Sequence, residues 1–318
     1  MSKKYFNGSP DEQSFGVVEV EKEFATLPPA LYVIQSTMSG IRFEKKKYDT
    51  SELIVIEDSL VTSCINEIKS FWTKKDLFAS YNFPFKRGIL LFGAPGYGKS
   101  CALKLIMNDV IKMGGIGIQY DSAELFMIGL KLFRKVQPET PVVVLMEDID
   151  NIILYDEANT TDVLDGFNDI QNVVFVATTN SIDDLSDRIR DRPGRFDKRI
   201  EVGPPSEKIR KIYLESINSR PQIKPSIDID LLIKDTDGMS FAQMKECYIS
   251  IVLFESDYKE TIGRIKEMSS DLSEYSIKNK DPFDAVELAR VPPEMKKSNG
   301  KTGVIGPTSK HGPTGIQG

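Results

Sequence analysis

The chain has 318 residues, 40% of them hydrophobic and 28% charged, and its 41 Lys and Arg against 47 Asp and Glu give a net charge of −6. This length allows about two domains, and the acidic balance excludes a protein that coats nucleic acid or anionic membrane through a general basic surface. Three dispersed cysteines exclude a disulfide scaffold and a cysteine zinc site, and the single histidine, His311, lies in the tail, where it cannot serve as a buried catalytic base. No stretch approaches the roughly 20 apolar residues of a membrane span, so we expect a soluble cytoplasmic protein.

The first 52 residues predict an arm and a small β element. Residues 1–24 are mostly polar, and we expect a flexible arm there. In residues 25–52, the β-prone runs Leu31–Ile34 and Ile41–Phe43 flank Ser39 and Gly40, a pattern typical of a hairpin.

Residues 53–204 alternate apolar runs with helical patterns after a first helix at 59–74. Strands are expected at 88–92, 116–120, 142–146, 173–177 and 199–202, and the helices between them at 99–112, 123–136, 162–171 and 184–191. Unbroken apolar strands that alternate with helices predict a parallel sheet covered on both faces.

Beyond Pro204 and Pro205 the sequence predicts a smaller α-helical domain over residues 205–291. Its helices are expected at 207–218, 228–234, 240–256 and 281–290, with a polar, weakly structured stretch around 260–280. Residues 292–318 are rich in Gly, Pro, Ser and Thr, and we expect a disordered tail.

The most specific motif is a phosphate-binding loop of the pattern G-x-x-x-x-G-K-[ST]. It consists of Gly93, Ala94, Pro95, Gly96, Tyr97, Gly98, Lys99 and Ser100. Glycines let several backbone N–H groups converge on one phosphate, and the following helix adds the positive end of its dipole. We expect Lys99 to reach the β- and γ-phosphates and the Ser100 hydroxyl to bind Mg²⁺.

Polar residues follow two of the buried strands at the edge where ligands bind in open parallel sheets. Glu147 and Asp148 end the first of these strands, where one carboxylate can hold hydrated Mg²⁺ and the other can activate a water. Asn180 ends the second and can hydrogen-bond that water or the γ-phosphate. The alternatives are a strand that ends in solvated acids and a turn-forming asparagine.

Four arginines, at positions 188, 190, 192 and 195, lie close together after Asn180. Read alone, they indicate a solvated salt-bridge patch. At a subunit edge, an arginine could instead complete a neighbour's phosphate site in trans.

Together, GAPGYGKS, LMEDID, VATTN and DRPGRFDKRIEV resemble, in the same order, the motifs of the AAA family within the AAA+ ATPases. The resemblance covers about residues 53–255. It implies an α/β fold of the P-loop NTPase type, with a five-stranded parallel sheet of order 5-1-4-3-2 followed by an α-helical lid.

The resemblance also implies the ligands and the assembly. ATP is expected to contact the loop from Gly93 to Cys101, together with Gly238 and Ala242, and Mg²⁺ to be held by Ser100 and, through water, Glu147. Asn180 matches the first sensor, and Arg192 and Arg195 match the two trans-acting arginines. Such arginines require a homo-oligomeric ring, commonly a hexamer.

Two departures from the family pattern stand out. The usual Asp-Glu pair is reversed to Glu147 and Asp148, as in the branch that resembles the mitochondrial Rieske-protein translocase, and the shorter Asp148 is expected to slow hydrolysis. The segment of the central-pore loop is shortened, so Phe126 and Met127 either face a pore or, as the helical spacing favours, point into the core.

The sequence therefore predicts an Mg²⁺-dependent ATPase, and we expect a ring that remodels or translocates a protein partner. One alternative is a nucleotide-dependent scaffold with little turnover. Another is a nucleic-acid-linked loader or packaging accessory, suggested by the short basic runs Lys45–Lys47 and Lys74–Lys75, which more often form a solvated face. The protein client is not encoded in any motif.

Overall fold

The computed structural model describes residues 5–8, 14–18, 25–38, 40–47, 54, 60–165, 171–220 and 227–278. One compact unit spans Met1–Lys266. Of a second unit, Glu267–Gly318, the described part contains only the end of the last helix. The expected helix at 281–290 and the expected tail at 292–318 lie outside the described residues.

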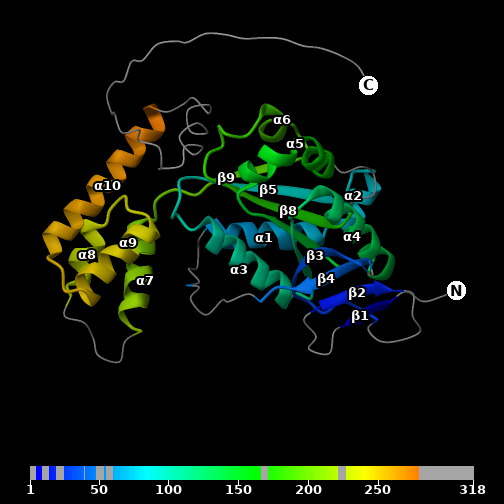
Figure 1. Ribbon diagram of the computed structural model, residues 1–318, viewed down its shortest axis with the longest axis horizontal. Coiled ribbons are helices and arrows are strands. Elements are labelled where there is room, and N and C mark those ends of the chain that lie inside the picture. The colour runs from blue at the N-terminus through cyan, green and yellow to red at the C-terminus, as the bar shows by residue number, and fades with distance from the viewer. Residues whose placement is uncertain are drawn as a thin grey trace, which may run out of the picture. The chain divides into compact units, whose positions relative to one another are not determined.

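A nine-stranded sheet of order β1-β2-β4-β3-β6-β7-β8-β5-β9 forms the centre of the first unit (Figure 1). Five of the strands are parallel to one another, and they are β5 (Lys86–Phe92), β6 (Ile116–Gln119), β7 (Val142–Met146), β8 (Val173–Thr179) and β9 (Lys198–Glu201). Numbered in chain order within this set, they follow the predicted order 5-1-4-3-2. The predicted parallel sheet is confirmed.

The remaining four strands extend this sheet beyond β6. They are β1 (Tyr5–Gly8), β2 (Ser14–Val18), β3 (Leu31–Thr37) and β4 (Gly40–Lys45). The expected hairpin is present as β3 and β4, but β3 also pairs in parallel with β6, so the hairpin continues the main sheet. The structure places β1 and β2 where we expected an arm, because β2 pairs with the outer edge of β4.

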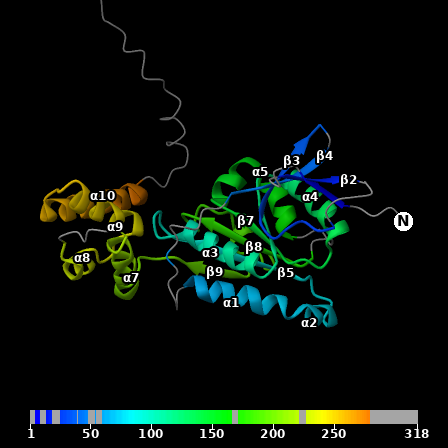
Figure 2. The ribbon, with the colours of Figure 1, turned by 90° about the horizontal axis from the view of Figure 1, so that it is seen from below.

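Helices cover both faces of the parallel strands (Figure 2). On one face, α1 (Leu60–Trp72) and α3 (Lys99–Lys112) bury an apolar cluster that includes Ile68, Leu103 and Val143. On the other, α4 (Ala123–Val136) and α5 (Ile149–Asp165) bury a second cluster that includes Phe126 and Phe175. Every residue of β7 and β8 is buried, as strands covered on both faces require.

The short helices α2 (Lys75–Ser80) and α6 (Asp187–Arg190) complete this part of the fold. The helix α5 begins at Ile149, well before the expected start at 162, and its backbone leaves the helical region at Asp156. Ile149 is buried, and Ile152 and Ile153 pack against the second cluster, so packing on the sheet stabilises this first part of α5.

A smaller helical domain follows β9, as predicted. It contains α7 (Glu207–Asn218), α8 (Ile229–Asp235), α9 (Phe241–Tyr248), a π-helical segment (Ile249–Leu253) and α10 (Tyr258–Lys278). These helices share a core of their own, centred on Leu214, Leu232 and Met244. The stretch around 260–280, expected to be weakly structured, forms most of α10 instead, because Ile262 and Ile265 join that core. No helix among the described residues is both long and apolar enough to cross a membrane.

Candidate functional site

The phosphate-binding loop connects β5 to α3 and depends on glycine at two of its positions. Gly98 caps α3 with a left-handed backbone (φ 95°), which side chains other than glycine rarely adopt. A Cβ atom on Gly93 would lie 2.3 Å from the Val202 carbonyl oxygen, so the start of the loop is packed against the chain that follows β9. These contacts fix the loop at the N-terminus of α3, where backbone N–H groups favour a bound anion.

Lys99 is the buried cation of this loop, with 6% of its surface exposed. Its Nζ donates hydrogen bonds to the Gly93 and Ala94 carbonyl oxygens, at 2.5 and 3.1 Å, and to Asn180 Oδ1 at 2.8 Å. Burial lowers the pKa of Lys99 below its usual value, and the carboxylates of Asp148 and Asp150 partly oppose this shift. The structure thus brings together the predicted phosphate ligand and the predicted sensor.

Glu147 and Asp148 both lie exposed at the carboxyl end of β7. The backbone of Asp148 is left-handed (φ 48°), and its N–H donates a hydrogen bond of 3.0 Å to Thr178 Oγ1 at the end of β8. A non-glycine residue in this conformation stores strain, which the hydrogen bond donated to Thr178 Oγ1 helps to offset. Thr178 therefore fixes the backbone of the expected base, a role that the sequence analysis did not assign.

Ser100 and Glu147 line one pocket of about 420 Å³ next to the loop. A hydroxyl and a carboxylate that face the same space suit Mg²⁺, which is held by few protein oxygens together with water and phosphate oxygens. Ser100 and Glu147 would hold the ion here. When bound, Mg²⁺ neutralises charge on the phosphates during transfer.

Asp150 is a residue of this site that the sequence analysis left without a role. It lies in the first turn of α5, and its charge acts on Lys99. Among the described residues, its Oδ1 oxygen is buried and lacks a hydrogen-bond partner. A buried carboxylate oxygen left unpaired costs free energy, which is typical of a functional site. Its place two residues after Asp148 was the only signal in the sequence.

The N-terminus of α9 lies against the phosphate-binding loop. The Phe241 N–H donates a hydrogen bond of 3.1 Å to the Gly96 carbonyl oxygen. A Cβ atom on Gly96 would lie 3.2 Å from the Cβ of Ala242, so the structure places Ala242 beside the loop, as expected for a nucleotide contact. Reciprocal bonds between Ser240 and Gln243 cap the helix and fix its direction.

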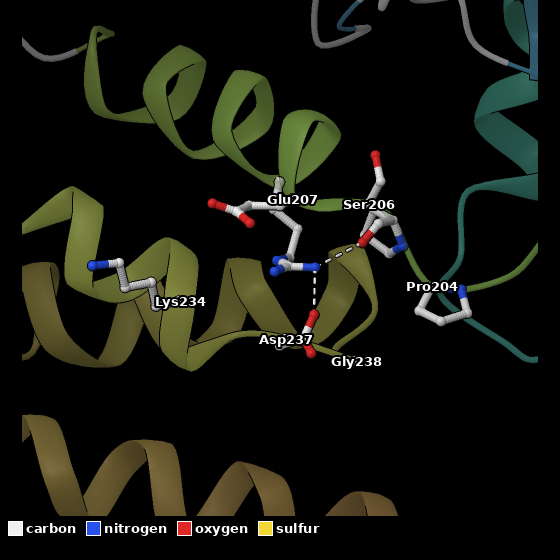
Figure 3. Close-up of a pocket in the computed structure, with 8 residues that line it drawn as sticks. Pro204, Ser206, Glu207, Lys234, Asp237 and Gly238 are labelled. Atoms are coloured by element: carbon white, nitrogen blue, oxygen red, sulfur yellow. Dashed lines mark hydrogen bonds and ion pairs between the residues drawn. The ribbon is translucent and has the colours of Figure 1, made fainter.

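Gly238 lines a second pocket, of about 580 Å³, at the start of the helical domain (Figure 3). Arg210 is buried in its wall and pairs with Asp237 Oδ1 at 2.7 Å and with the Pro205 carbonyl oxygen at 3.0 Å. Figure 3 shows Glu207 near this pair and the Lys234 side chain pointing away from it. Because Arg210 ties the connection after β9 to the loop before Gly238, this region sets how the helical domain follows the sheet domain.

The two predicted trans-acting arginines differ in exposure. The Arg195 side chain is only 2% exposed, and its Nε and Nη2 bind the two carboxylate oxygens of Asp165 at 2.6 and 2.8 Å. Its Nη1 donates to the Arg188 carbonyl oxygen. The Arg192 side chain is 60% exposed, and its Nη1 forms an ion pair with Asp165 Oδ2 at 3.2 Å. Neither arginine lines the pocket that Ser100 and Glu147 share.

Phe126 is 2% exposed, and Met127 packs partly buried against the same core. The interpretation that these residues point into the core, favoured by their helical spacing, is confirmed.

A parallel sheet with a phosphate-binding loop after its first strand, acids after its third and an asparagine after its fourth defines the P-loop class of nucleotide-binding proteins. Residues 89–204 match the model of the ATPase family associated with various cellular activities (AAA). Residues 89–204 therefore form an AAA ATPase domain, the domain that AAA+ ATPases share.

Curated relatives agree with this assignment. A putative cell division cycle ATPase of Plasmodium falciparum (isolate 3D7) is 28% identical over 227 residues, which cover 66% of this chain and 18% of the relative. The ATP-dependent zinc metalloprotease FtsH 1 of Petrotoga mobilis is 28% identical over 265 residues (73% and 40%). Proteasome-activating nucleotidase 2 of Haloferax volcanii is 30% identical over 188 residues (53% and 45%). The chain thus spans less than half the length of each of these relatives.

Proposed function

We propose that this chain hydrolyses ATP between the subunits of a homo-oligomeric ring, commonly a hexamer in this family, and uses the energy to remodel or translocate a protein partner. The observation that carries the proposal is the convergence of Lys99, Ser100, Glu147, Asp148 and Asn180 at one edge of the sheet.

Each of these residues has a proposed task. Lys99 exchanges its bonds to Gly93 and Ala94 for bonds to the β- and γ-phosphates, and Asn180 stays within reach of the γ-phosphate because it already contacts Lys99. Asp148 orients the attacking water and accepts its proton, since its strained backbone projects it at the end of β7. The Asp148 side chain is one methylene shorter than a glutamate side chain, so ATP turnover is slow.

Arg192 is the arginine that we assign to the neighbouring subunit's ATP. An arginine that acts in trans must extend from the surface of its own subunit to reach the neighbouring one, and the Arg192 side chain is 60% exposed. The buried bidentate pair of Arg195 with Asp165 holds the loop that presents Arg192. In this assignment Arg195 is a positioning residue.

The protein client is supported by the names of relatives, which include a zinc metalloprotease and a proteasome-activating nucleotidase. Their full activities belong to longer chains. For this chain the substrate is proposed as a class only, a protein.

Mixed assemblies test the trans assignment. Arg192→Ala and Asp148→Asn subunits are each expected to bind ATP and to hydrolyse little of it alone. Mixed in equal amounts, they should regain part of the wild-type ATPase rate, because some interfaces then combine an intact Asp148 with an intact Arg192. Arg188→Ala, an exposed arginine nearby, serves as the matched control. Absence of any regained activity would refute a shared site, and unchanged turnover in Asp148→Asn would refute the role of Asp148.

A further inference from the structure

The pocket that contains Ser100 and Glu147 also gathers three lysines, whose role the nucleotide site does not explain. Lys46 and Lys47 follow β4, and Lys104 lies on α3, four residues after Ser100 and therefore on the same helix face. Gln119, Leu31 and Leu145 line the same pocket. Segments more than fifty residues apart in the sequence thus bring three lysines to one concave surface.

The extended sheet positions these lysines. The Lys46 N–H donates a hydrogen bond of 2.8 Å to the Leu31 carbonyl oxygen, and its Nζ donates one of 2.5 Å to Gln119 Oε1. Gln119 in turn donates to Asp121 Oδ1 at 3.3 Å. Because β3 pairs directly with β6, the end of β4 is carried to the edge of the sheet where Ser100 lies.

Among the described residues that line the pocket, lysines outnumber carboxylates three to one. Lys46, Lys47 and Lys104 line the same pocket as Glu147, and the charge of Lys46 acts on Asp121. Among the described residues, neither Lys47 nor Lys104 forms an ion pair. An excess of positive charge in one pocket favours an anion from solution, and ammonium groups are common phosphate ligands.

We propose that the lysine-lined part of this pocket, next to the phosphate-binding loop, is a second oxyanion site, which takes up the inorganic phosphate released by ATP hydrolysis. Water adds to the γ-phosphorus, the bond to the β–γ bridging oxygen breaks, and ADP, phosphate and a proton result. The phosphate carries about 1.5 negative charges at neutral pH. It passes Ser100 and meets Lys104, Lys46 and Lys47 before it reaches solvent.

The shape of the pocket favours a small anion over a nucleic-acid strand. A bound strand needs a long basic groove, whereas this pocket is concave, measures about 420 Å³ and has Glu147 in its wall. The volume suits a phosphate ion with part of its hydration shell, since one water takes about 30 Å³. Only the source of the phosphate rests on the proposed function; the site itself requires no turnover.

Direct binding of radiolabelled inorganic phosphate tests the site. The full chain is first loaded with ADP and beryllium fluoride, which fill the phosphate-binding loop and the γ-phosphate position, and loading is checked by the amount of bound ADP. Wild type should then bind one phosphate per chain. Lys47→Ala with Lys104→Ala should weaken this binding at least tenfold, since hydrogen bonds between charged groups are the strong ones. Lys45→Ala removes an exposed lysine of the same run that does not line the pocket, and should leave binding unchanged.

Three outcomes would overturn the proposal. In the first, the loaded chain shows no saturable binding of phosphate. In the second, the Lys47→Ala and Lys104→Ala double variant keeps the wild-type melting temperature and binds phosphate as tightly as wild type. In the third, an equimolar single-stranded oligonucleotide displaces the phosphate. A chain that binds phosphate in this lysine-dependent way but does not hydrolyse ATP would refute the proposed function alone and leave the site standing.

Discussion

Replacing Arg195 by alanine should destabilise the protein, because this guanidinium is a buried partner of Asp165. The substitution removes two hydrogen bonds to the carboxylate, at 2.6 and 2.8 Å, and one to the Arg188 carbonyl oxygen. Breaking a fully buried pair costs about 3–5 kcal/mol. Asp165 is 33% exposed and keeps its contact with Arg192, so we expect about 3 kcal/mol. At roughly 2–4 °C per kcal/mol for a domain of this size, the melting temperature should fall by roughly 6–12 °C.

Thermal and urea unfolding of Arg195→Ala, Asp165→Ala and the double variant measure this cost and the coupling between the two side chains. A coupling of about 1.5 kcal/mol or more is expected at pH 7. The hydrogen bonds from Arg195 hold the pKa of Asp165 below its usual value, so this stabilisation is present above about pH 4 and is lost as the pH falls further. Arg192→Ala, on the exposed side chain, should change stability by less than about 0.5 kcal/mol. An Arg195→Ala protein as stable as wild type would refute the positioning role.

Three further variants test other parts of the structure. Asp150→Asn should lower the pKa of Lys99 further, because it removes a carboxylate that favours the ammonium form. When ATP affinity is titrated from pH 7 upward, it should therefore fall at a lower pH in this variant than in wild type. An unchanged pH profile of ATP affinity would contradict this coupling. Phe126→Ala should cost about 3–5 kcal/mol in urea unfolding, against about 1 kcal/mol or less for the half-exposed Ile128→Ala; equal costs would place Phe126 outside the core. Gly88→Ala should prevent folding or cost about 3 kcal/mol or more, since its Cβ would lie 1.7 Å from the Arg195 carbonyl oxygen, whereas Gly203→Ala meets no atom within 4 Å and should be tolerated.

The parallel sheet could be predicted because its signals are local. Runs such as Val142–Met146 are apolar throughout, and the phosphate-binding loop fixes which strand comes first. The acids after β7 and the asparagine after β8 could be placed together for the same reason, since parallel strands end at a common edge. The contact between Lys99 and Asn180 is the result.

Other features depend on partners that are distant in sequence. Nothing in the sequence distinguishes the arginines of the cluster from one another. In the structure, Asp165, thirty residues before Arg195, binds Arg195 inside the fold, whereas Arg192 stays exposed. Strands β1 and β2 lack a distinctive pattern, and their pairing with β4 defines them. The unpaired oxygen of Asp150 follows from how α5 packs, which periodicity alone does not reveal.

The ATPase rate per subunit, measured against protein concentration with the assembled mass determined in parallel, tests the central claim most directly. A rate that rises as rings form, and that disappears in Lys99→Ala, is the result that a site shared between subunits predicts. A rate per subunit that stays constant down to concentrations where only monomers exist would contradict it.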